Sequence, residues 1–78
     1  MRNLTHLKIH EKGIIKGFTD ETLSVKLMEM GCLPGAEISL ELIAPLGDPI
    51  AIEVAGYQLS LRKTEASSIL LEEVSHVS

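Results

Sequence analysis

The stretch AEISLELIAPLGDPIAIEVAGYQLSLR, residues 36–62, decides the fold. It contains three runs in which apolar and polar side chains alternate. Because a β-strand sends successive side chains to opposite faces, each run predicts a strand with one buried face. The inward-facing residues are predicted to be Ile38, Leu40 and Leu42, then Ile50, Ile52 and Val54, then Tyr57, Leu59 and Leu61. Among these, the expected centre of the core is Ile38, Leu40, Ile52 and Leu59.

Two short connections separate the three runs. Residues 44–49, APLGDP, contain two prolines and a glycine, which do not continue a sheet ladder, so they predict a loop. Gly56 lies between the second and third runs and predicts a tight turn. The three runs therefore form a three-stranded antiparallel meander, and the rest of the chain must cover its apolar face.

A helix is predicted before the meander. Asp20 is a favourable N-cap, and the helix continues to about Met30 because Gly31 follows. With about 100° between successive residues, Val25 and Met28 lie on the side away from the sheet. The opposite, sheet-facing side carries Leu23, Leu27 and Met30.

The N-terminal part contributes one more strand. Residues 1–12 are expected to form an irregular or extended lead-in, and residues 11–18 are a strand candidate. Gly13 and Gly17 either weaken this strand or mark bends where a small sheet must curl.

The C-terminal part completes the fold. Residues 63–68 predict a helical turn with Thr64 as its cap, and residues 69–74 predict a last strand. Five short strands fit a strongly bent barrel, since closure removes exposed sheet edges. The sequence therefore predicts a mainly β fold, a small SH3-like β-barrel with one short inserted α-helix, as a single domain over residues 1–78.

The charge and composition exclude several classes of function. The net charge is −4, and the seven Lys and Arg residues are scattered, which disfavours binding to nucleic acid or to an anionic membrane surface. No apolar run approaches the roughly 18–20 residues that span a bilayer, and the first residues do not resemble a signal peptide. The single cysteine, Cys32, permits no internal disulfide. These features predict a cytoplasmic protein without membrane insertion.

No residue pattern predicts a catalytic site, a metal site or a bound cofactor. His6 and His10 are four residues apart, but a metal site needs three or four ligands, so Glu11 or His76 would have to contribute. We interpret both as solvated surface histidines. Cys32 is interpreted as a small apolar packing residue. The solvent-facing side of the strands is expected to carry Glu41, Glu53, Glu72 and Glu73.

The loop with the prolines is the best candidate for a specific contact, because exposed loops on a rigid scaffold commonly carry function. Leu46 is an apolar residue at the tip of this loop. Two interpretations are equally open: Leu46 contacts a partner, or it folds back onto the barrel.

Three segments carry a resemblance to a known family. They are KLMEMGCLPG at residues 26–35, APLGDPI at residues 44–50, and LSLRKTEA at residues 59–66. Their order and spacing resemble the FeoA family over roughly residues 5 to 74. The chain departs from the family pattern at Cys32, where an aliphatic residue is usual, and at Lys26, where arginine is common.

The resemblance implies a small cytoplasmic accessory protein of bacterial ferrous-iron uptake, with an SH3-like barrel and no enzymatic activity. The implied partner is FeoB, the membrane permease with a cytoplasmic G-protein domain. The family supplies no catalytic or metal-ligating residues to transfer to this chain. Two functions are open: an interaction module that modulates the permease, or a ferrous-iron-binding sensor or chaperone of the same uptake system.

The helix and the loop are together predicted to form the permease-binding surface. Val25 and Met28 point away from the barrel, so either Leu4 and Leu7 fold over them or a partner covers them. Lys26 borders this patch and is expected to pair with a carboxylate of the partner. The predicted partner-binding residues are Val25, Lys26 and Met28 in the helix, and Pro45, Leu46, Gly47 and Asp48 in the loop.

Overall fold

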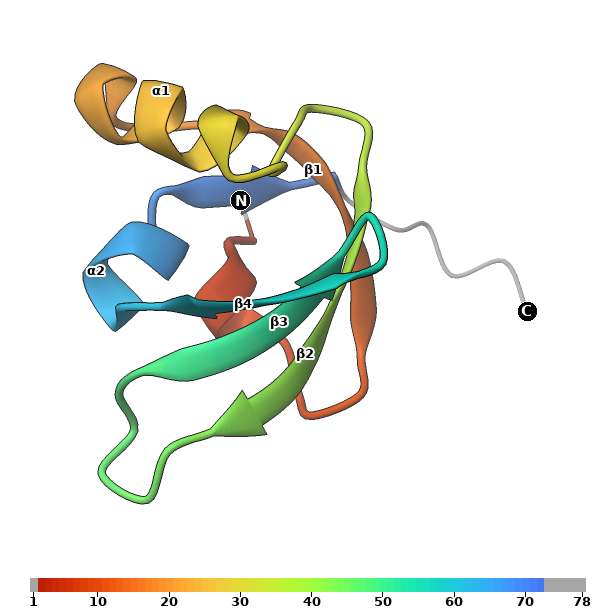
Figure 1. Ribbon diagram of the computed structural model, residues 1–78, viewed down its shortest axis with the longest axis vertical. Coiled ribbons are helices and arrows are strands. Elements are labelled where there is room, and N and C mark those ends of the chain that lie inside the picture. The colour runs from red at the N-terminus through yellow and green to blue at the C-terminus, as the bar shows by residue number, and fades with distance from the viewer. Residues whose placement is uncertain (1, 73–78) are drawn as a thin grey trace.

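The structure is a computed structural model that describes residues 2–72 (Figure 1). These residues form one bent antiparallel sheet with strand order β4-β3-β2-β1-β5. In chain order the elements are η1 (Leu4–His6), β1 (Lys12–Phe18), α1 (Glu21–Glu29), β2 (Glu37–Ile43), β3 (Ile50–Val54), β4 (Tyr57–Leu61), α2 (Lys63–Ala66) and β5 (Ile69–Leu71). The prediction of a mainly β fold with a helix between the first two strands is confirmed.

The predicted meander is formed by β2, β3 and β4. In β3 the inward residues Ile50, Ile52 and Val54 are buried, as the alternation predicts. The tight turn is confirmed as well: Ala55 and Gly56 connect β3 to β4 with φ angles of 51° and 82°. Two successive positive φ angles are typical of a type I′ turn, whose twist matches that of the flanking strands.

Alternation predicts the first meander strand only in part. Ile38 and Leu40 are buried, but Leu42 is 60 % exposed, so its predicted inward position is wrong. The register of β2 on β3 shifts between Leu40 and Leu42, and such a bulge moves the following side chains to the other face. In β4, Leu61 is buried as predicted, but Leu59 is only half-buried against the core and Tyr57 is 63 % exposed, so β4 buries less of its inner face than the alternation predicts.

The first strand bends, and this bend curls the sheet. Residues Lys12–Ile14 pair with β2, whereas Ile15–Phe18 pair with β5. The register shifts between Ile15 and Gly17, which supports the interpretation of Gly17 as a bend. Gly13 instead leaves room for the side chain of Leu71, because a Cβ placed on Gly13 would lie 3.0 Å from a methyl group of Leu71.

Helix α1 follows the prediction closely. The Asp20 carboxylate accepts a hydrogen bond from the Leu23 backbone N–H at 3.0 Å, and so caps the first turn. The helix ends before Gly31, whose φ of +104° favours glycine. Leu27 is fully buried, and Leu23 and Met30 pack against the core, which confirms the predicted inner face.

The two ends of the described chain pack together. Leu4 and Leu7 enter the core, and the Leu71 backbone N–H donates to the Arg2 carbonyl at 2.9 Å, so residues 2–3 cover the outer edge of β5. Strand β5 includes Ile69–Leu71, and Val74 of the predicted strand lies outside the described residues.

The cap predicted for the short C-terminal helix is wrong. Thr64 lies inside α2, so it cannot cap its start. Instead, the Asp48 carboxylate accepts a hydrogen bond from the Lys63 backbone N–H at 3.0 Å. Glu65 accepts one from the Arg62 N–H at 2.8 Å. Asp48, 15 positions before Lys63, thus bonds a free backbone N–H at the start of α2. The local sequence around α2 does not reveal this contact.

Candidate functional site

The outward face of α1 is partly open to solvent. Val25 is 57 % exposed, while Met28 is half-buried and is not part of the core cluster. Leu4 and Leu7 do not cover this face, because η1 packs against α2 and β5. Of the two possibilities that the sequence leaves open for covering Val25, the N-terminal residues are therefore excluded.

Lys26, the charged residue expected beside the outward face of α1, has an ion-pair partner within the chain. The Lys26 ammonium lies 2.7 Å from Oε2 of Glu65 in α2. Only 12 % of the Glu65 side chain is exposed, and its other oxygen accepts the Arg62 N–H. The hydrogen bond from Lys26, followed by that from Arg62, lowers the pKa of the Glu65 carboxyl below its ordinary value. Lys26 is therefore not an unpaired charge beside Val25.

In the loop of residues 44–49, the position of Leu46 shows whether this side chain folds back onto the barrel. Leu46 is 96 % exposed, so it does not fold back onto the barrel, and Pro45 is exposed beside it. Gly47 has a φ of +89°, and its N–H donates to the Ala44 carbonyl at 2.7 Å, so it shapes the turn. Asp48 is occupied by capping α2. Within the loop, Leu46 thus presents a large apolar side chain to solvent.

The structure does not bring the helix and the loop together. Figure 1 shows α1 at one end of the longest axis and the loop between β2 and β3 at the other. Strand β2 accounts for much of this separation, because it leads down to the loop and its seven residues span about 20 Å. The prediction that α1 and the loop are adjacent is therefore wrong, and they form two separate surfaces.

Sequence reasoning missed the apolar residues next to Leu46. Leu42 is 60 % exposed and Ile43 is 40 % exposed at the end of β2. We call Leu42, Ile43 and Leu46 the hairpin end. The run Leu42–Ala44 is the signal that could have revealed it, since three successive apolar residues cannot all face one side of a strand. Beside it lies a pocket of about 140 Å³, lined by Thr5, Leu40, Ile43, Gly47, Ile50 and Lys63.

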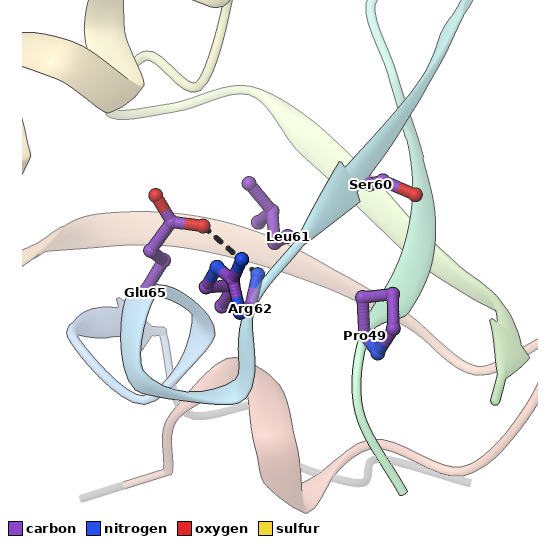
Figure 2. A pocket seen from close by; sticks show the side chains of 5 residues that line it. All are labelled: Pro49, Ser60, Leu61, Arg62 and Glu65. Atoms are coloured by element: carbon purple, nitrogen blue, oxygen red, sulfur yellow. Dashed lines mark hydrogen bonds between the residues drawn. The ribbon is translucent and has the colours of Figure 1, made fainter. Parts of the chain in front are cut away.

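A second hollow, of about 290 Å³, lies where β4 meets α2 (Figure 2). Its lining consists of Pro49, Ser60, Leu61, Arg62 and Glu65. The Glu65 carboxylate in this hollow already accepts hydrogen bonds from Lys26 and from the Arg62 N–H. No histidine or cysteine lines it beside Ser60, so its described lining does not assemble a nucleophile with a general base.

His6 and His10 are exposed, as the sequence predicts for surface histidines, and the cysteine is buried. Nδ1 of His6 accepts the Asn3 N–H at 3.1 Å, and Nδ1 of His10 lies 3.3 Å from a carboxylate oxygen of Glu41. Cys32 is buried, and burial raises the pKa of its thiol, as expected for a packing residue. Residues 2–72 contain no cluster of three or more His, Cys, Asp or Glu side chains that could hold a metal ion. His76 and Glu73 lie outside the described residues.

Of the four carboxylates assigned to the solvent face, two are exposed, one is half-buried, and Glu73 lies outside the described residues. Glu53 and Glu72 are exposed, and Glu41 is half-buried beside His10.

Within residues 2–72, no helix has both the length and the apolar character needed to cross a bilayer.

Comparison with known proteins connects this fold to iron transport. The Fe(2+) transport protein A/Fe(2+) transporter FeoB fusion protein of Porphyromonas gingivalis is 36 % identical over 50 residues. These residues are 64 % of this chain but 6 % of that protein, so the chain spans only a small part of the curated relative it matches.

Solved structures agree with the fold. The FeoA-like protein of Clostridium acetobutylicum has a TM-score of 0.83 and 42 % identity, and the match covers 95 % of this chain and 91 % of that one. The zinc complex of FeoA from Stenotrophomonas maltophilia, described as a prokaryotic SH3 domain protein, has a TM-score of 0.79 at 21 % identity, with 92 % and 91 % covered. The predicted SH3-like fold is therefore confirmed.

Nearly the whole chain also matches a protein-family model. The model of the FeoA domain matches residues 2–73, which include all the strands and helices described above. The chain therefore belongs to the FeoA family, which is linked to ferrous iron transport.

Proposed function

We propose that this chain is a non-enzymatic, cytoplasmic accessory protein of bacterial ferrous iron transport, which binds and modulates a FeoB-type permease through protein–protein contacts. The observation that carries the proposal is the relative in which FeoA and FeoB are parts of one polypeptide. Fusion places the two parts at a high effective concentration, which is useful when they contact one another. The cytoplasmic G-protein region of the permease is the proposed site of contact.

The hairpin end is the surface that we assign to this contact first. Leu46 is 96 % exposed, and Leu42 and Ile43 extend the apolar surface along β2. Exposed apolar residues that gather in one place commonly mark interaction sites. The adjacent pocket of about 140 Å³ could receive an apolar side chain of the partner. Pro45, Gly47 and Asp48 hold the loop in shape rather than supply most of the binding energy.

The outer face of α1, with Val25 and Met28, is proposed as a second and separate contact. Lys26 stabilises this face by pairing with Glu65 and is not assigned a partner carboxylate. Since the two surfaces lie at opposite ends of the molecule, one permease domain would have to extend along the barrel to reach both (Figure 1). Substituting each surface separately distinguishes their roles.

Binding of the purified 78-residue chain to the permease's cytoplasmic G-protein region tests the proposal. The measurement is made by surface plasmon resonance under anaerobic conditions, with and without Fe(II). We expect saturable binding without added Fe(II). No binding in either condition would refute the interaction. Binding that requires Fe(II) would favour the alternative, a ferrous-iron sensor or chaperone.

A further inference from the structure

One edge of the sheet is left open in the described chain. Strands β4 and β5 are the two outer strands of the order β4-β3-β2-β1-β5. The outer edge of β5 is covered, because Asn3 bridges to Leu70 and Leu71 donates to Arg2. In contrast, within residues 2–72 the strand β4 pairs only with β3. Its other edge therefore presents unpaired backbone groups.

The geometry of the turn between β3 and β4 identifies which backbone N–H and C=O groups of β4 are unpaired at the open edge. In a two-residue type I′ hairpin, the residues that flank the turn, here Val54 and Tyr57, exchange backbone hydrogen bonds. Bonded and non-bonded pairs alternate along an antiparallel ladder, so Leu59 and Leu61 also bond to β3. The N–H and C=O groups of Gln58 and Ser60 consequently point away from β3, toward the open edge.

This edge lacks the usual protection against pairing. Natural edge strands commonly carry a lysine, a proline or a bulge. The sequence of β4, YQLSL, contains no charge and no proline, and its register on β3 is regular. Gln58 and Ser60 are exposed. A second strand therefore has backbone groups to bond at these two residues.

We propose that β4 pairs antiparallel with β4 of a second copy of this chain, about a two-fold axis at Leu59. In this register Gln58 lies opposite Ser60 of the second copy, and Ser60 lies opposite its Gln58. All the outward N–H and C=O groups of these residues are then bonded, because they form two hydrogen-bonded pairs. The strand complements itself without any change of conformation.

The side chains favour a second copy as the occupant. A charge in β4 could face a like charge across the two-fold axis, but the strand contains none. Leu59, which is half-buried, would pack against Leu59 of the second copy. Tyr57 is 63 % exposed although it lies on the inner side of β4, and it would pack near Leu61 of the second copy. Pairing thus covers the exposed side chain of Tyr57 and the part of Leu59 that the core leaves uncovered.

The expected dimer is weak. An edge of five residues buries less than the roughly 1,200 Å² that stable complexes need, so association should depend on protein concentration. The proposal does not rest on permease binding, because the hairpin end and α1 take no part in it.

Two matched double variants test the proposal by sedimentation velocity over a concentration series. Gln58→Lys with Ser60→Lys places lysine opposite lysine twice across the axis, whereas Gln58→Lys with Ser60→Glu places lysine opposite glutamate twice. We expect wild-type dimers to weaken at least tenfold in the first variant and to be retained in the second. The first variant is also less negative overall, so a reduction in its association cannot result from greater net repulsion.

The amide resonances of the wild-type chain give a second, site-specific measurement. Concentration-dependent shifts at Gln58 and Ser60, but not at Leu46, support the pairing. A monomer at all accessible concentrations would overturn the proposal, as would equal association of the two variants when circular dichroism shows both to be folded. Shifts confined to the hairpin end would also contradict it.

Discussion

Lys26 in α1 and Glu65 in α2 are joined by an ion pair, with Nζ 2.7 Å from Oε2. The two residues are 39 positions apart in the chain. The pair links the helix inserted after β1 to the helix that connects β4 to β5. Because Glu65 also accepts the Arg62 N–H, its carboxylate both caps α2 and holds it to α1.

We expect the coupling between Lys26 and Glu65 to be modest, at about 0.5–1 kcal/mol, because the lysine side chain is 60 % exposed and solvent screens the pair. A double-mutant cycle with Lys26→Met and Glu65→Gln, followed by urea denaturation, measures it. Lys12→Met is the matched control, since its ammonium lies 3.8 Å from Glu37 and both side chains are more than 60 % exposed. Equal losses for Lys12→Met and Lys26→Met would contradict the assigned role.

The lowered pKa of Glu65 predicts a pH dependence of stability. A carboxyl with a folded-state pKa below its ordinary value of 4.5 stabilises the fold fully above that pH. This contribution is lost as the pH falls through the lowered pKa, because the folded state must then take up the proton. The stability difference between wild type and Glu65→Gln should therefore shrink as the pH falls below 4.5. A difference that stays constant down to about pH 2 would contradict this expectation.

The two glycines of β1 should respond differently to substitution. A Cβ at Gly13 would lie 3.0 Å from Leu71, whereas one at Gly17 would have no neighbour within 4 Å. We expect Gly13→Val to lower the free energy of unfolding by about 1–3 kcal/mol through overpacking, and by more than Gly17→Val. Thermal denaturation of both variants checks the order. The reverse order would show that the contact with Leu71 relaxes freely.

Substitution of Ile52 tests which face of β3 is buried in the core. Its side chain is fully buried in β3, so Ile52→Ala should cost about 2–5 kcal/mol. Glu53→Ala is the control, because the neighbouring side chain is exposed on the other face of the same strand. Urea denaturation of both variants gives the difference. Comparable stability for the two would mean that the faces of β3 are assigned in reverse.

Leu46→Asp is expected to weaken permease binding at least tenfold while leaving the melting temperature unchanged, because the side chain is 96 % exposed. Leu33→Asp, 52 % exposed and distant from the loop in sequence, is the matched control for placing a carboxylate on an exposed leucine. Val25→Asp tests the face of α1 separately. If only Val25→Asp weakens binding, the helix rather than the hairpin end is the interface.

The sequence determined those features that short-range chemistry controls. Alternation in residues 36–62 predicted the meander and the buried face of β3, since the two-residue period of a strand depends only on local geometry. Asp20 and Gly31 predicted both ends of α1 for the same reason, because capping acts within one turn. The family followed from residue identities in three separated segments.

Only the tertiary structure decided which residues are available for contact. The bulge that exposes Leu42 depends on pairing with β3, and the partner of Lys26 lies on a helix far along the chain. The separation of α1 from the loop between β2 and β3 arises because β2 carries the chain to the opposite end of the barrel (Figure 1). Exposure and adjacency depend on how distant segments pack, and no local pattern records that packing.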